Sequence, residues 1–177
     1  MNFASINLFD VANGNGIRVS LFVSGCNFGC KGCFNVDCQK FEYGSPFTET
    51  EHNLIIDRLK DDNFQGLSLL GGDPLWQDEE GLKQLIALAK ETHKLKKDVW
   101  MWSGFTFEEV MKIPKTPIEE LRLKLLKECD VFIDGRFELN KKSLGLIWKG
   151  SSNQRVIDIK KSLRENRVIE VDEYYDD

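Results

Sequence analysis

The sequence lacks any apolar run long enough to cross a membrane, which takes about 20 predominantly apolar residues in a helix. It also lacks an excess of positive charge, since 24 Lys and Arg stand against 29 Asp and Glu and the net charge is −5. Surfaces that bind nucleic acids or anionic lipids are usually basic. We therefore expect neither a nucleic acid nor a membrane as a partner.

A secretory signal is also missing, because the first residues show no basic segment followed by an apolar segment and a small-residue cleavage site. We therefore expect a cytoplasmic protein. Thiols stay reduced in that compartment, so the five cysteines are expected to be free thiols or metal ligands rather than disulfides. Histidine is scarce: His52 and His93 are the only two, and both fall on predicted helices among polar residues. We expect both at the surface and neither as a ligand.

The length of 177 residues suits one domain with a substantial core. A hydrophobic content of 41% and a charged content of 30% are ordinary for a globular protein. No internal repeat, low-complexity segment or linker divides the chain. The sequence predicts a single domain over residues 1–177, with residues 151–177 as a less regular C-terminal extension.

Segments with the composition of strands alternate with segments that have the periodicity of helices. The predicted strands are Phe3–Leu8, Ile17–Val23, Gly66–Leu70, Lys97–Trp102 and Val131–Asp134. Four helices are predicted. The first begins at the capping box Thr48–Glu51 and has Leu54, Ile55 and Leu59 on its apolar face, and the second has Leu82, Leu85, Ile86 and Ala89 on one face. The third runs from the capping box Thr106–Glu109 to about Ile113, and the fourth covers Ile118–Cys129. In the extension we predict a helix and then a strand near Val168–Val171.

This alternation indicates an α/β fold, either a partial (β/α) barrel or an open, mostly parallel sheet flanked by helices. Ligands of such folds lie beyond the carboxyl ends of the strands. Three loops follow predicted strand ends: the cysteine-rich loop after Val23, the Gly-Gly-Asp-Pro turn after Leu70, and the Ser-Gly-Phe loop after Trp102. We expect them to converge on one edge of the sheet.

Three of the five cysteines form the motif CX3CX2C, at Cys26, Cys30 and Cys33. Iron–sulfur clusters are normally held by four thiolates, so three imply a cubane with one iron open to a small molecule. Cys38 could instead complete a four-thiolate zinc site. From the cysteines alone both metals remain open, and Cys38 and Cys129 are otherwise expected to be small apolar residues or incidental thiols.

The second motif is the turn Gly71-Gly72-Asp73-Pro74. Two glycines at a strand end expose backbone amide and carbonyl groups and allow a ligand to approach closely, and the carboxylate of Asp73 could orient a cationic amine. Alone the motif also fits an ordinary strand-to-helix turn. Its position after the cysteine loop favours a functional interpretation.

Together these motifs resemble the radical S-adenosylmethionine superfamily, in which CX3CX2C precedes a Gly-Gly-acid-Pro turn. Within it, the chain is similar to the activating proteins of anaerobic ribonucleoside-triphosphate reductases, from about Phe3 to Ile159. The similar segments are Asp10–Cys26, Gly32–Asn35, Leu70–Leu75, Trp102–Glu109, Asp130–Phe137 and Lys149–Val156. Gly32 stands where the superfamily usually has an aromatic residue, which this group tolerates. Trp102–Phe105 replaces a frequent Tyr-Thr-Gly-Tyr run and lacks its phenolic hydroxyl.

The resemblance implies two cofactors: one [4Fe-4S] cluster, held by Cys26, Cys30 and Cys33, and S-adenosylmethionine bound to the open iron. It implies that the cofactor is cleaved to methionine and a 5′-deoxyadenosyl radical, with no catalytic side chain beyond the cluster-bound cofactor. It places Gly71, Gly72 and Asp73 at the methionine end and Gly32, Cys33 and Phe34 near the adenine. Core packing is an equal alternative for Phe34.

The resemblance also implies partners: the glycyl-radical subunit of an anaerobic ribonucleoside-triphosphate reductase, and a low-potential electron donor such as flavodoxin or ferredoxin. Arg136 and Arg155 are candidate contacts or cofactor anchors, with structural roles as the alternative. Other hypotheses are an activase of a different glycyl-radical enzyme, a radical enzyme acting on a small molecule, and a zinc-stabilised binding module.

Overall fold

The computed structural model describes residues 1–171, and within them the strands form one seven-stranded sheet of order β3-β1-β2-β4-β5-β6-β7. The strands are β1 (Asn2–Asp10), β2 (Ile17–Val23), β3 (Ser45–Pro46), β4 (Phe64–Gly71), β5 (Asp98–Trp102), β6 (Val131–Asp134) and β7 (Arg155–Asp158). The central strands β2, β4, β5 and β6 are parallel, whereas β1, β3 and β7 add antiparallel pairs at the two edges. The sheet does not close into a barrel, and the predicted open α/β sheet is confirmed.

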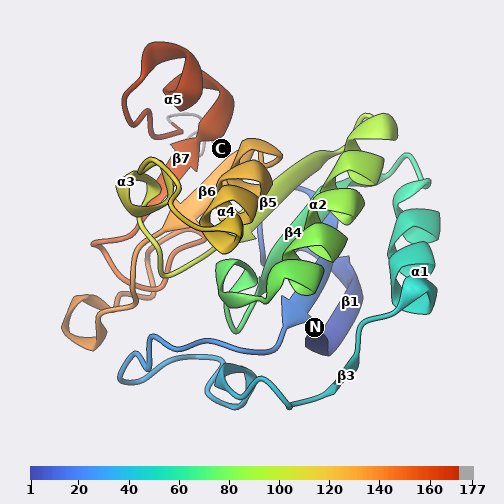
Figure 1. Ribbon diagram of the computed structural model, residues 1–177, viewed down its shortest axis with the longest axis horizontal. Coiled ribbons are helices and arrows are strands. Elements are labelled where there is room, and N and C mark those ends of the chain that lie inside the picture. The colour runs from blue at the N-terminus through green and yellow to red at the C-terminus, as the bar shows by residue number, and fades with distance from the viewer. Residues whose placement is uncertain (172–177) are drawn as a thin grey trace.

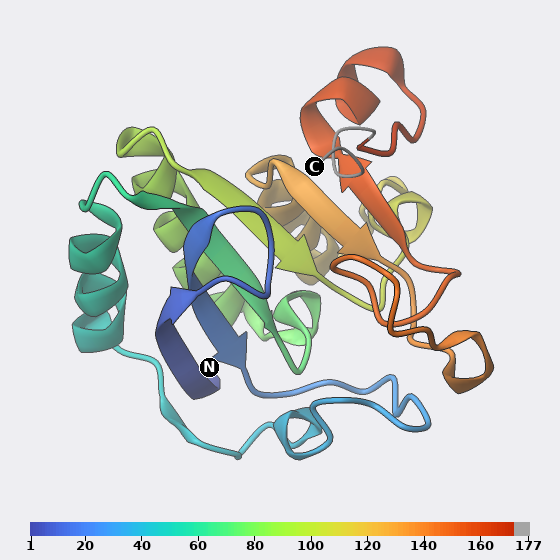
Figure 2. The ribbon, with the colours of Figure 1, turned by 180° about the vertical axis from the view of Figure 1, so that it is seen from behind.

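In the part of the chain that the structure describes, the helices cover one face of this sheet. The helices are α1 (Glu49–Leu59), α2 (Glu79–Lys94), α3 (Phe107–Val110), α4 (Pro117–Lys127) and α5 (Ile159–Glu165), with short 3-10 turns η1 (Asp37–Gln39), η2 (Pro74–Trp76) and η3 (Leu139–Lys141). In Figure 1 the helices α2 and α4 lie in front of the strands, and α1 lies at the side of the sheet next to β1. Figure 2 shows the opposite face without such a layer, where the loop of residues 11–16 crosses the strands.

Arg18 of β2 lies fully buried beneath that loop. Its guanidinium donates to the Ser68 hydroxyl at 2.7 Å, the Leu67 carbonyl at 2.9 Å and the Asp98 carboxylate at 2.6 Å. A buried charge is tolerated only when it is paired and hydrogen-bonded, as it is here. Two further bonds reach the loop itself: the Arg18 guanidinium donates to the Asn15 carbonyl at 3.2 Å, and the Ser68 hydroxyl donates to the Asn13 carbonyl at 2.6 Å. These bonds hold the loop against the face opposite the helices.

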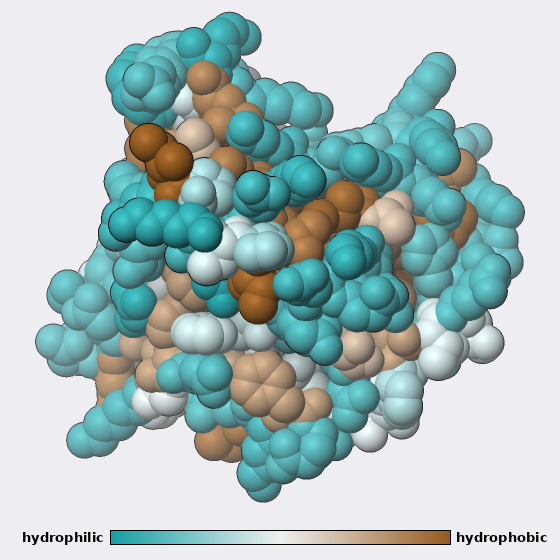
Figure 3. All heavy atoms as spheres, viewed as in Figure 1, coloured by the Kyte–Doolittle hydropathy of each residue, from teal (hydrophilic) through white to brown (hydrophobic). Residues whose placement is uncertain are grey.

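The hydrophobic core lies between the helices and the other face of the sheet. Its buried members include Ile55 and Leu59 of α1 and Leu82 and Leu85 of α2, as predicted. Leu54 was wrongly placed on the apolar face: it is 46% exposed, because it lies beside the face of α1 that turns to the core. In Figure 3 hydrophilic side chains cover most of the viewed face, and apolar patches follow the line between α2 and α4.

Two predicted element boundaries were wrong. Helix α3 ends at Val110 rather than near Ile113. Pro114 disfavours helical backbone at Ile113, so the helix could not extend through that residue. In the extension, β7 pairs with β6 before the helix α5, and Glu170 makes only an isolated bridge to Ile157 where a strand was predicted. Residues 172–177 of the extension lie outside the described residues. No helix within residues 1–171 combines the length and apolar character needed to span a membrane.

Candidate functional site

A cavity of about 400 Å³ lies where the central parallel strands end. The three predicted loops line it together, and the segment that follows β6 closes one side. Its lining includes Cys26, Phe28, Cys30, Cys33, Phe34 and Asn35 from the first loop, Gly71, Gly72 and Asp73 after β4, Ser103 and Gly104 after β5, and Gly135, Phe137, Trp148, Lys149, Gly150 and Gln154 from the last segment. The predicted convergence of the three loops is confirmed.

The cysteine loop leaves the sheet after β2, and backbone hydrogen bonds between Gly25–Cys26 and Cys38–Gln39 join its two ends. The Gly25 N–H donates to the Cys38 carbonyl at 2.7 Å, and the Cys26 N–H donates to the Gln39 carbonyl at 3.0 Å. Between these ends, Gly29 and Gly32 have φ values of +61° and +74°, a left-handed backbone that glycine adopts without strain. The loop therefore turns sharply on both sides of Cys30, and this brings all three motif cysteines to the cavity wall.

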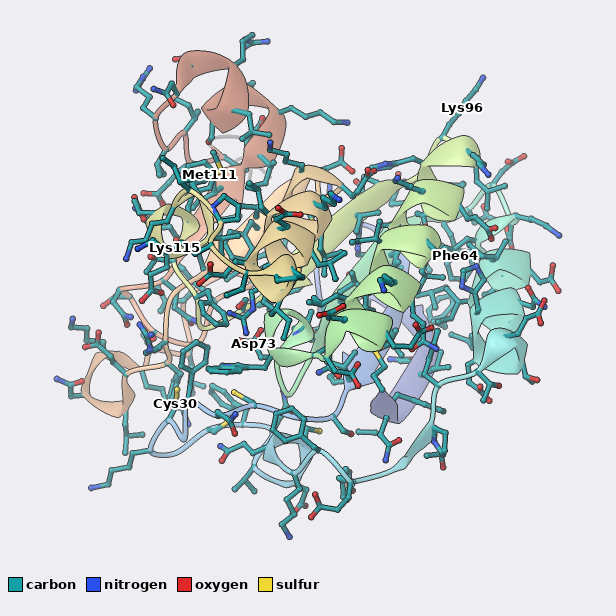
Figure 4. All side chains as sticks on the ribbon, viewed as in Figure 1. Cys30, Phe64, Asp73, Lys96, Met111 and Lys115 are labelled. Atoms are coloured by element: carbon teal, nitrogen blue, oxygen red, sulfur yellow. The ribbon has the colours of Figure 1, made fainter. Side chains whose placement is uncertain are left out.

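The motif thiols are free and partly buried, and Figure 4 shows Cys30 among neighbouring sulfur atoms at one end of the molecule. Burial raises the pKa of Cys26 to about 12, with further contributions from Asp73 and the other two thiols. Burial likewise raises the pKa of Cys30. Because metals bind thiolates, loading a metal here must release protons.

Cys38 lies outside the cavity lining, and burial, with a smaller contribution from the nearby Cys33, raises the pKa of its thiol. It is 9% exposed, and its backbone rather than its sulfur closes the base of the loop. Within residues 1–171, no three His, Cys, Asp or Glu side chains gather closely enough to hold a single metal ion. The three motif thiols are instead spread around the cavity wall.

The Gly-Gly-Asp turn packs directly against the cysteine loop. The Gly72 N–H donates to the Val23 carbonyl at 2.7 Å, and the Asp73 N–H donates to the Gly25 carbonyl at 2.9 Å. The Asn35 side-chain amide donates to the Gly71 carbonyl at 3.1 Å. A Cβ at Gly72 would lie 2.5 Å from the Cys38 carbonyl oxygen and 2.7 Å from that of Gly25. Glycine is required here because the two loops touch through their backbones.

Asp73 lies between the loops, with its carboxylate buried and fully engaged within the chain (Figure 4). It accepts hydrogen bonds from the Leu75 N–H at 2.8 Å, the Ser103 hydroxyl at 2.9 Å and the Gly104 N–H at 2.8 Å. Burial raises its pKa from the usual 3.8 to about 6, although these hydrogen bonds lower it. The carboxylate thus links the loop after β4 to the loop after β5.

Asp73 should make stability depend on pH in a way that Asn at this position does not. The folded-state pKa lies above the unfolded value, so the folded protein holds the proton more tightly between about pH 4 and pH 6. The unfolding free energy of the wild type, relative to that of Asp73→Asn, should therefore fall by about 3 kcal/mol as the pH rises through this range. Urea unfolding of both metal-free proteins at several pH values measures the difference. A difference that rises, or stays constant, would contradict the burial argument.

Aromatic and amide side chains complete the cavity, and the motif analysis missed most of them. Phe34 is 62% exposed at the rim, so its predicted alternative of core packing was wrong; its ring meets that of Phe137 edge-on, with centres 5.1 Å apart. The Trp102 indole N–H donates to the Trp148 carbonyl at 2.6 Å. The one sequence signal for these residues was their location at or after the carboxyl ends of predicted strands.

Arg136 and Arg155 make ion pairs within the chain. Arg136 pairs with Glu109 at 3.1 Å, and its guanidinium lies 4.4 Å from the centre of the Phe28 ring in the cysteine loop. Arg155 pairs with Glu108 at 2.7 Å and donates to the buried Asp134. These contacts favour a structural role for Arg155 and place Arg136 beside the cysteine loop.

Comparisons with known proteins agree on one family. Residues 12–157 match the family described as a 4Fe-4S single cluster domain. The chain is similar to the anaerobic ribonucleoside-triphosphate reductase-activating protein of Pasteurella multocida, with 39% identity over 87% of this chain and 95% of the relative. Proteins of the same name from Enterobacteria phage T4 and Escherichia coli K12 are 38% and 34% identical, each over 88% of this chain and over 93% and 97% of their own lengths.

Proposed function

The chain belongs to the family of anaerobic ribonucleoside-triphosphate reductase-activating proteins, and on this premise we propose how its cavity serves a radical S-adenosylmethionine activase. The product of such an enzyme is a glycyl radical on an anaerobic, class III ribonucleoside-triphosphate reductase. One observation carries the proposal for the site: the three motif thiols and the Gly-Gly-Asp turn line a single cavity.

The donor set suits a [4Fe-4S] cluster with one open iron. Cys26, Cys30 and Cys33 offer three sulfur ligands around one cavity, and thiolates are the usual ligands of such clusters. The backbone of Gly71 and Gly72 borders the same space and lets a ligand approach without side chains in the way. When bound, the cluster and S-adenosylmethionine supply a one-electron reductive cleavage that yields methionine and a hydrogen-abstracting 5′-deoxyadenosyl radical.

We assign the remaining lining residues to the second ligand. Gly71, Gly72 and Asp73 would border its methionine end, with the Asp73 carboxylate fixing the turn through Ser103 and Gly104. Gly32, Cys33 and Phe34 would lie near the adenine. Phe34 offers an exposed ring face for stacking at the rim.

The chain itself controls protons and water at the site. The raised pKa of Cys26 keeps its thiol protonated until a metal displaces the proton. Phe28, Phe137 and Trp148 give the cavity apolar walls that keep solvent away from a reactive intermediate. The protein thus supplies binding, orientation and exclusion of side reactions.

We further propose that the chain works in the cytoplasm and receives electrons from a low-potential donor such as flavodoxin or ferredoxin. All five of its cysteines are free, which suits a reducing compartment. The cleavage consumes one electron, which the described residues do not themselves supply.

Anaerobic incubation tests the function directly. Reconstituted protein with S-adenosylmethionine, dithionite and the purified reductase should form 5′-deoxyadenosine and a glycyl-radical EPR signal on the reductase. The control omits the activating protein and should show no signal. Cleavage of the cofactor without a radical on the reductase would contradict the activase assignment and favour another substrate, and stoichiometric zinc without sulfide would contradict the cluster.

A further inference from the structure

Residues 136–150, within the connection between β6 and β7, form a flap beside the cavity, and the Gln154 side chain joins its two ends. The Gln154 amide donates to the Gly135 carbonyl at 2.8 Å and accepts from the Gly150 N–H at 2.9 Å, so it joins both ends of the flap. Lys142 and Ser151 add an antiparallel bridge. The flap is therefore held in a defined position relative to the sheet.

The flap packs against the cysteine loop. Leu139 lies 2.9 Å from where a Cβ of Gly32 would be, and the Lys142 ammonium lies 4.8 Å from the centre of the Phe34 ring. In Figures 1 and 2 the flap projects from one corner of the molecule beside the tip of the cysteine loop. Together, the two segments form the rim of the cavity.

This rim exposes apolar side chains that the fold does not use. Leu144 is 93% exposed and Ile147 is 41% exposed in the flap, and Phe34 and Val36 are each 62% exposed in the cysteine loop. Single exposed apolar residues are ordinary, but several on two segments that pack together beside one cavity are typical of an interaction surface.

The flap is also basic within an acidic chain. Residues 136–150 carry Arg136, Lys141, Lys142 and Lys149 against Glu138, a net charge of +3 in a chain of net −5. Such a local reversal of charge attracts an acidic partner and orients its approach. The combination fits a protein surface that is acidic at its rim and apolar at its centre.

We propose that the flap and the adjoining cysteine loop are the surface on which the reductase docks to present its glycine to the cavity. This inference rests on the proposed function. Hydrogen-atom transfer requires the glycine to reach the reacting atoms, so the reductase must contact the cavity mouth. An electron donor need only come within tunnelling distance and can bind elsewhere, which favours the reductase as the occupant of the rim.

Matched substitutions test the docking surface with the purified reductase of the organism that encodes this chain. Leu144→Asp and Lys141→Glu change exposed flap residues outside the cavity lining. Ile113→Asp and Lys96→Glu are the controls, because Ile113 is 87% exposed in the loop after α3 and Lys96 projects from the end of the molecule far from Cys30 (Figure 4). Affinity for the reductase is measured anaerobically on cluster-loaded proteins at two salt concentrations.

Each flap variant should bind the reductase about tenfold more weakly than the wild type, whereas the controls should bind as the wild type does. Lys141→Glu should also weaken the salt dependence of binding. Formation of 5′-deoxyadenosine without reductase should stay unchanged in all four variants. If the wild type activates the reductase and the flap variants bind it normally, the docking surface is wrong and the proposed function stands. If the flap variants lose only reduction by the electron donor, the occupant is the donor and the inference also fails.

Discussion

Cys26→Ala, Cys30→Ala and Cys33→Ala are each expected to abolish glycyl-radical formation. Each substitution removes one of the three proposed sulfur ligands, all of which line the cavity, whereas Cys38 does not line it. The yield of radical should fall by more than about 100-fold, because loss of even an outer-shell partner of a metal ligand typically costs 10- to 100-fold. Iron and sulfide content after anaerobic reconstitution, together with EPR of the reductase, measures the effect.

Cys38→Ala is the matched control, because Cys38 lies in the same loop but outside the cavity lining. It should keep about four irons and four sulfides per chain. The chain also offers Cys129→Ala as a second control, with a sulfur fully buried in the core. If Cys38→Ala lost its metal, the three-cysteine assignment would be wrong and a four-thiolate site would replace it.

Gly72→Ala is expected to have the second largest effect. A single methyl group at this position would lie 2.5 Å from the Cys38 carbonyl oxygen and 2.8 Å from the Gly25 nitrogen, both backbone atoms. Relief requires the cysteine loop to move away from the end of β4, at a cost of about 1–3 kcal/mol of unfolding free energy. A displacement of about 1 Å at a reacting centre can lower the rate about 100-fold.

Gly145→Ala provides the comparison, because its nearest neighbour is the Ser143 hydroxyl at 3.9 Å. It should match the wild type in unfolding free energy, cluster content and rate of 5′-deoxyadenosine formation. All three quantities should be lower in Gly72→Ala than in the wild type. Equal behaviour of the two variants would show that the two loops do not need their close backbone contact.

The meeting of the three motif cysteines at one cavity was predictable because their motif is local in sequence. Cys26, Cys30 and Cys33 fall within eight consecutive residues, and β-branched runs such as Ile17–Val23 mark the strand that precedes them. Because ligands lie beyond the carboxyl ends of parallel strands, the loops that follow three predicted strands were expected to meet at one edge of the sheet. The structure confirms that convergence.

The remaining features depend on contacts between distant residues. Ser103 bonds Asp73 across 30 positions, and Gln154 joins the ends of the flap. Sequence reasoning treated Asp73 as free to meet a ligand, yet its carboxylate already accepts several hydrogen bonds from the chain. The short strand β7 was missed because its four residues gain their stability by pairing with β6, which local pattern does not reveal.

The hydrophobic core of the described chain includes none of the three motif cysteines. Small metal-dependent domains unfold when their metal is removed because the ion substitutes for a core. Here the core is complete beside the cysteine loop, and backbone bonds close that loop at its base. We therefore expect the polypeptide to keep its fold when oxidation removes the iron, and the same chain to accept a new cluster afterwards.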